Sequence, residues 1–277
     1  MKAEELKEKL KRIKDNDCIL EGSDSYYEMS REMMNHIGDV DPVLRDELIY
    51  EIFCVWVYER QVLNPEELKE LLESALDSNH LFYRIEEQNK DDVFTRTFSA
   101  LLITLILAVN NKNCFLSDEK FDVTKNKLID YMNGEKDVRG YVEGPGWAHS
   151  AAHTADGLDE LAVNERTDKE DLIKILEAIQ RKVLVGYYVY VDEESERMLN
   201  AVENAFNRKL LSEDEIINWF NQFISLRESC AFDTYIEKFH QKVNLKGFLR
   251  SAYFRFLSEE GYENIVERIR NILAELK

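Results

Sequence analysis

The sequence predicts an all-α fold in which helical hairpins stack into a single-domain α-α superhelix of the HEAT or armadillo kind. The 277-residue chain has only three prolines and ten glycines, few for a protein rich in tight β-turns. Apolar residues recur at helical spacing along nearly the whole chain. The resulting helix pairs follow one another about every 40–50 residues, which is typical of such hairpins. Because no residue-level repeat is visible, a compact irregular helical bundle is the alternative.

Residues that start helices delimit the segments. Asn64-Pro65-Glu66-Glu67 combines a capping side chain, a proline at the first helical position and acids in the first turn. Thr167-Asp168-Lys169-Glu170 and Ser212-Glu213-Asp214-Glu215 resemble capping boxes. The expected helices cover residues 2–14, 24–37, 41–60, 64–79, 91–110, 117–134, 146–161, 167–185, 192–209, 212–223, 226–241, 243–258 and 262–276.

No linker composition divides the chain, so one domain covering residues 1–277 is expected, with residues 1–40 as a helical N-terminal extension packed on the solenoid. Residues 186–191 are the only β-like stretch. Because no partner strand is apparent, we interpret this stretch as an extended connection between helices.

The charge balance excludes some classes of partner. With 36 Lys and Arg against 55 Asp and Glu, the net charge is −19, which argues against nucleic acids and anionic membrane surfaces as partners. The amino terminus lacks the apolar core of a signal peptide, and the apolar run from Phe98 to Val109 is too short to cross a bilayer. The four cysteines stand singly, without framework spacing. These features predict a cytoplasmic protein.

The most informative stretch is residues 146–161, which follows Gly144-Pro145 and is predicted to be helical. On such a helix, four polar side chains would share one face within about 60° of arc: His149, His153, Asp156 and Glu160. Two imidazoles one turn apart are conspicuous in a chain with only five histidines.

This face allows two interpretations. His149, His153 and Asp156 could act as ligands of a divalent metal such as zinc, iron or manganese, with Glu143 as a neighbour. However, position 150 is Ser, so the HExxH signature and its built-in base are absent. Alternatively, both histidines form hydrogen bonds to neighbouring helices inside a packed groove.

The same face could also belong to a polar ligand pocket. Arg139 lies in the loop that leads to this stretch, and Arg96 lies on an otherwise apolar helix, where a charge needs a partner. Arg139 could bind a small anionic ligand, with Trp147 as an aromatic wall. The simpler alternative is an Arg–carboxylate pair that holds the loop in place.

These motifs resemble those of an uncharacterised bacterial family, domain of unknown function 2785. The resemblance lies in Arg139-Gly140-Tyr141, Gly146-Trp147-Ala148-His149, Ala152-His153 and Ala155-Asp156, with further similarity at Arg45-Asp46-Glu47, Tyr50, Trp56 and Arg96-Thr97-Phe98-Ser99, and spans about residues 40–260. It implies an all-helical, HEAT-like cytoplasmic protein, most often from Gram-positive bacteria, and brings no established activity.

Two hypotheses for function follow. The leading one is a non-enzymatic module that binds proteins, peptides or a ligand in a concave groove. Its lining would comprise Arg96, Arg139, Glu143, Trp147, His149, His153 and Asp156. The alternative is a metal-dependent, hydrolase-like enzyme with His149, His153 and Asp156 as ligands and Glu143 or Glu160 as base.

Overall fold

The computed structural model describes residues 1–276 except 23, 88–90 and 231, and in this part of the chain nearly all of the regular secondary structure is helical. Its α-helices are α1 (Ala3–Asp15), α2 (Tyr26–Met34), α3 (Glu51–Phe53), α4 (Pro65–Ala75), α5 (Asp92–Asn113), α6 (Asp118–Gly134), α7 (Ser150–Val163), α8 (Lys169–Val183), α9 (Glu194–Asn207), α10 (Glu213–Ser229), α11 (Tyr235–Phe256) and α12 (Glu263–Glu275). Wider π-helical turns, η1 (Val43–Tyr50) and η2 (Cys54–Glu59), flank α3, so that Val43–Glu59 is one continuous helical segment.

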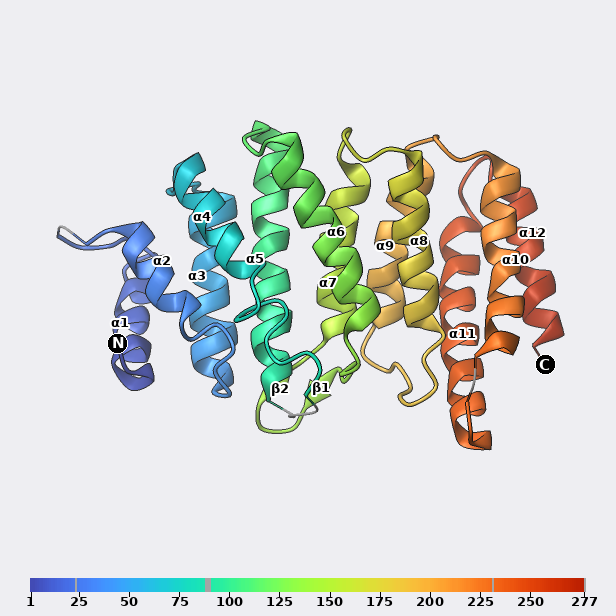
Figure 1. Ribbon diagram of the computed structural model, residues 1–277, viewed down its shortest axis with the longest axis horizontal. Coiled ribbons are helices and arrows are strands. Elements are labelled where there is room, and N and C mark those ends of the chain that lie inside the picture. Colours follow the sequence, from blue (N-terminus) through green and yellow to red (C-terminus); the bar gives the residue numbers. More distant parts are fainter. Residues whose placement is uncertain (23, 88–90, 231, 277) are drawn as a thin grey trace.

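The helices stand side by side in an elongated row with the two termini at opposite ends (Figure 1). In one layer α5 packs on α7, α7 on α9 and α9 on α11, while α6 packs on α8 in a second layer. Most buried apolar side chains form one connected core from Leu6 to Leu276, and Val93, Phe94 and Ala148 form a small separate cluster beside the hairpin residue Val142. The N-terminal helix α1 buries Leu6, Leu10 and Ile13 and packs against η1.

Helix α5 is the central apolar element. The apolar run from Phe98 to Val109 is too short to cross a bilayer, as expected. The whole helix, at 22 residues, is nevertheless long and apolar enough to do so. However, 83% of its most apolar window is buried inside the protein. Because α4, η2 and α7 pack around α5, burial inside the protein accounts for its apolar composition.

The helix boundaries near the C-terminus differ from the prediction. Helix α10 extends to Ser229, and a single 22-residue helix, α11, replaces the two expected over 226–241 and 243–258. A capping box explains the new start: the Thr234 side chain accepts from the Glu237 backbone N–H, and the Glu237 carboxylate accepts from Thr234. The Thr-x-x-Glu pattern is the local sequence signal for this helix start.

The largest departure precedes α7. This helix begins at Ser150 instead of residue 146, because residues 141–147 form a small hairpin of β1 (Tyr141–Val142) and β2 (Gly146–Trp147). His149 therefore lies before the helix, with a left-handed backbone at φ 48°. Residues 186–191 are an extended connection without strand pairing, as predicted.

We predict that Gly38→Ala destabilises the fold. A Cβ atom at Gly38 would lie 2.5 Å from the backbone N and Cα of Thr95, so α5 would have to shift, at a cost of about 1–3 kcal/mol. In contrast, Gly247→Ala in α11, where the nearest atom would be 4.0 Å away, should stabilise the protein by about 0.5–1 kcal/mol through helix propensity. Urea denaturation of both variants measures these effects, and equal stability of the two would contradict the close approach of Gly38 to α5.

Candidate functional site

The hairpin before α7 is anchored to the helical scaffold through its backbone. Val142 pairs with Gly146 and Tyr141 with Trp147, and the two residues after Trp147 continue the pairing: Ala148 N–H donates to the Gly140 carbonyl at 3.0 Å and His149 N–H to the Arg139 carbonyl at 2.8 Å. The buried Arg45 of η1 donates to the Pro145 carbonyl at 2.5 Å. Its guanidinium also lies 4.2 Å and 4.8 Å from the ring centroids of Phe94 and Phe98.

Glycine is required at two positions of this loop. Gly146 has φ +85°, and a Cβ atom there would come within 3.3 Å of Arg45 and Asp46. Gly140 lies so close to Asp192, in the connection before α9, that a side chain would overlap the Asp192 carboxylate. That carboxylate accepts from the Tyr141 N–H at 3.0 Å. The Arg-Gly-Tyr and Gly-Trp motifs therefore join the loop to η1 and to the connection before α9.

His149 links the hairpin to the start of α9. Its Nε2 is 2.8 Å from the Asp192 carbonyl, and its ring stacks on Trp147 at a centroid distance of 5.0 Å. The Glu194 carboxylate, only 1% exposed, lies 3.9 Å from the same nitrogen, and its Oε1 has no hydrogen-bond partner among the described residues.

His153 lies one turn into α7 and is buried against α5. Its Nδ1 is 3.0 Å from the Thr97 hydroxyl, and its ring meets Phe98 edge to face at 5.8 Å. The His149 and His153 ring centroids are 5.4 Å apart. The two imidazoles therefore do lie together, although only His153 belongs to the helix.

Both histidines are disposed to be neutral. Burial lowers the pKa of His149 below its usual value, although the bond to the Asp192 carbonyl opposes the shift. Burial lowers the pKa of His153 further, and the neighbouring His149 adds to the effect. Burial also raises the pKa of Glu194. Burial therefore shifts the pKa of all three groups in the direction that favours their uncharged forms.

The proposed metal ligands do not converge. Asp156 pairs with Arg197 through both carboxylate oxygens, with Arg197 Nε 2.7 Å from Oδ1. Each imidazole is already bonded, to Asp192 or to Thr97. Across residues 1–276, leaving out the undescribed positions, no three His, Cys, Asp or Glu side chains are arranged to hold a metal ion. The alternative in which the histidines bond to neighbouring helices matches this geometry.

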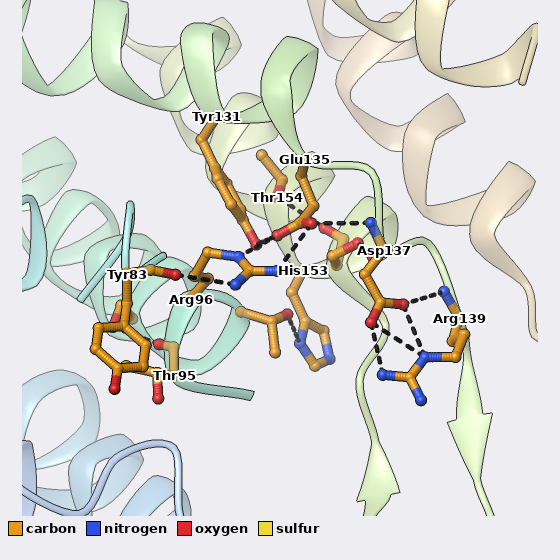
Figure 2. Close-up of polar contacts among 12 residues, drawn as sticks. Tyr83, Thr95, Arg96, Tyr131, Glu135, Asp137, Arg139, His153 and Thr154 are labelled. Carbon is orange, nitrogen blue, oxygen red and sulfur yellow. Dashed lines mark hydrogen bonds and ion pairs between the residues drawn. The ribbon is translucent and has the colours of Figure 1, made fainter. Parts of the chain in front are cut away.

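Arg96 does not face the histidines but forms a buried ion pair with Glu135, which follows α6 (Figure 2). Its Nε and Nη2 donate to the carboxylate at 2.5 Å and 3.0 Å, and Nη1 donates to the Tyr83 carbonyl at 2.9 Å. The Tyr131 hydroxyl also donates to Glu135 at 2.9 Å. Although burial opposes it, the Glu135 carboxylate raises the pKa of Arg96.

Arg139 is likewise paired within the protein. Figure 2 shows its guanidinium against the Asp137 carboxylate, with Nε 2.8 Å from Oδ1 and Nη2 2.6 Å from Oδ2. Glu143 lies exposed at the hairpin turn. The residues expected to line one groove are thus divided between separate contacts, because Arg96, Arg139 and Asp156 each pair with an opposite charge of their own.

A second buried cation, Lys182 of α8, belongs to the same network. Its Nζ donates to the Glu135 carbonyl at 2.5 Å. Burial lowers the pKa of Lys182 to about 8, and the Glu135 charge opposes the shift only in part. Glu135 therefore connects α5, α6 and α8 through its carboxylate and its carbonyl.

Several residues of the site were not identified as such from the sequence. In the sequence, Thr97, Phe98 and Arg45 are noted only as parts of the motifs that resemble the family. Asp192, Glu194 and Arg197 fall in the first turns of the helix expected over residues 192–209, and no role is predicted for them. The one sequence signal that could have pointed to Asp192 and Glu194 is the run of acidic residues directly after the β-like stretch 186–191. Nothing in the local pattern paired them with a histidine more than 40 positions away.

What the site exposes is aromatic. Trp147 is 40% exposed and Tyr141 is 56% exposed, and their rings form an edge-to-face pair at 5.1 Å. We call Tyr141, Trp147 and His149 the aromatic platform. The Trp147 ring stacks on the buried His149, which is bonded to the connection before α9, and the Tyr141 ring packs against Trp147.

One comparison with known proteins matches the chain to a family. A family described as "Protein of unknown function (DUF2785)" matches residues 81–254, which is more than half of the chain. This range includes both histidines and the hairpin but not Arg45, and it is shorter than the span of the resemblance. No curated protein and no solved structure matches the chain.

His153→Ala should lower the free energy of unfolding at pH 7 by about 1–3 kcal/mol, because the buried Thr97 hydroxyl loses its partner. The pKa of His153 is lower in the folded protein than in the unfolded chain. The unfolded chain therefore binds more protons below about pH 6.5, and stability falls as the pH drops through the folded pKa. The difference between wild type and variant should shrink between pH 7 and 5 in denaturant titrations. His240→Ala, at a partly exposed position of α11, is the control, and a constant difference would contradict a neutral, buried His153.

Lys182→Met tests the buried cation in the alkaline range. The folded pKa of about 8 lies below the usual 10.5, so the unfolded chain binds more protons between these values, and wild type gains stability as the pH rises from 8 to 10.5. Relative to Lys182→Met, the gain should be about 2–3 kcal/mol. Parallel pH profiles of the two proteins would show that Lys182 titrates normally.

Proposed function

The chain belongs to the DUF2785 family of proteins of unknown function, and from its own surface we propose that it is a cytoplasmic protein- or peptide-binding module on a single-domain, HEAT-like helical scaffold. The observation that carries the proposal is the aromatic platform, which keeps two large aromatic rings exposed on a rigid support.

Exposed tryptophan and tyrosine side chains are the residue types that most often dominate the energy of protein interfaces. In this hairpin the rings are ordered before any partner binds, because Trp147 stacks on His149 and the strands are bonded to Gly140, Arg139 and Arg45. Pre-ordering reduces the entropy lost on association. This rigidity distinguishes the platform from a single exposed aromatic side chain.

The row of stacked helices in Figure 1 supports the HEAT-like assignment, since such solenoids bind peptides and proteins along extended surfaces. The connected core from Leu6 to Leu276 supports a single domain. Four cysteines without a disulfide suit a reducing compartment.

The other candidate functions have less support. A small anionic ligand would need a free cation, whereas Arg96 and Arg139 each hold a carboxylate. A metal-dependent hydrolase would need converging ligands, whereas Asp156 is bound to Arg197. No specific observation favours either function over recognition of a protein surface.

Selection from a phage-displayed random peptide library tests the proposal. On the wild-type protein we expect a convergent consensus sequence, and the synthetic consensus peptide should bind Trp147→Ala at least about tenfold more weakly, as the loss of an aromatic anchor predicts. Tyr58→Ala, which removes a similarly exposed aromatic ring (39% exposed) at η2, should leave the affinity unchanged. Thermal melting of both variants checks that the fold is intact. Binders that ignore Trp147, or a selection that never converges, would overturn the proposal.

A further inference from the structure

Helix α11 carries a second surface that the aromatic platform does not explain. Large apolar side chains are exposed at both ends of the helix, including Tyr235 at 81% and Phe254 at 70%. Six of the exposed large apolar side chains of the described residues lie on α11 or at its C-cap: Tyr235, Ile236, Phe239, Val243, Phe254 and Leu257. The Tyr235 and Phe239 rings stack at a centroid distance of 6.3 Å.

The same helix is basic in an otherwise acidic protein. It carries Lys238, Lys242, Lys246, Arg250 and Arg255 against one carboxylate, Glu237. That carboxylate accepts from the Thr234 N–H and hydroxyl and so belongs to the helix cap. Within the described residues, Lys238, Lys246 and Arg250 form no ion pair, although the net charge of the chain is −19.

Basic and apolar side chains share one exposed face. At about 100° per residue, Tyr235, Phe239, Val243, Lys246, Arg250, Phe254 and Leu257 fall within about 100° of arc. From Tyr235 to Phe254 this face is about 30 Å long, at 1.5 Å per residue. We call it the α11 face. Its opposite side is buried against α9 and α12, and the buried Asn244 bonds it to the connection before α9.

We infer that the α11 face docks an acidic amphipathic helix of a partner protein, with a leucine or aromatic stripe flanked by Asp and Glu. Tyr235, Phe239 and Val243 follow one another at a spacing of four residues, and Lys246 and Arg250 continue this row toward Phe254, so the row forms a ridge of the kind that packs against another helix. Unpaired Lys238, Lys246 and Arg250 supply the complementary charge.

Other occupants fit less well. A long polyanion such as RNA or an anionic membrane would meet the field of a chain with net charge −19, whereas a short helix meets only the local charge of α11, within a screening length of about 8 Å. Two copies of the protein joined through this face would bring Lys246 and Arg250 against like charges.

The test uses two labelled 22-residue peptides with the same leucine and phenylalanine stripe, one flanked by Glu and the other by Lys. Fluorescence anisotropy with the full-length protein should show the Glu peptide binding at least about tenfold more tightly than the Lys peptide at low salt, and the preference should shrink as salt screens the charges. Lys246→Glu/Arg250→Glu should reverse the preference. Phe239→Ser/Phe254→Ser should weaken binding of the Glu peptide at least about tenfold.

The matched control is Lys2→Glu/Lys11→Glu, which makes the same charge change on α1, at the opposite end of the row (Figure 1). It should leave both affinities unchanged, and circular dichroism melting should show every variant folded. Equal affinity for the two peptides, no binding of the Glu peptide, or loss of the preference in the α1 control would overturn the inference. Tighter binding of a 20-nucleotide RNA or of phosphatidylserine vesicles would overturn it as well, and so would a dimer in sedimentation that the α11 charge reversal dissolves.

Discussion

The ion pair between Arg96 and Glu135 is the constraint on which the centre of the molecule depends. Both side chains are 3% exposed, so neither charge could remain inside without the other. The pair joins α5 to the end of α6, and the Glu135 carbonyl binds Lys182 of α8. Three helices from different parts of the chain therefore meet at one residue. This arrangement fixes the point from which the chain leaves α6 and enters the hairpin.

Beyond Glu135, hydrogen bonds between polar groups hold the two-histidine region together. Asp137 holds Arg139, the Arg139 carbonyl accepts from His149, and His149 reaches the connection before α9. On α5, the Thr97 hydroxyl forms a hydrogen bond with the His153 ring. The histidines are thus more easily understood as uncharged hydrogen-bonding groups between helices than as ligands. At the surface, the His149 ring supports the exposed Trp147 ring.

Two surfaces stand out against a protein whose charge is otherwise strongly negative. The aromatic platform is rigid and uncharged at its centre, whereas the α11 face is apolar and basic. The connection of residues 186–192 links the elements that carry these surfaces, since Asp192 bonds Tyr141 and His149 of the hairpin region, while Tyr190 bonds Asn244 on the buried side of α11.

The sequence by itself determined the all-α class and most helix starts, because capping and periodicity are local. Asn64, Ser117 and Ser212 cap helices within one residue of their expected starts. It also drew attention to His149, His153 and Trp147, which do lie together. Only the tertiary structure decided that His149 precedes α7 and that Arg96, Arg139 and Asp156 hold separate partners. The pairs His153–Thr97 and His149–Asp192 span 56 and 43 positions, and helical periodicity specifies which face a residue occupies but not what packs against it.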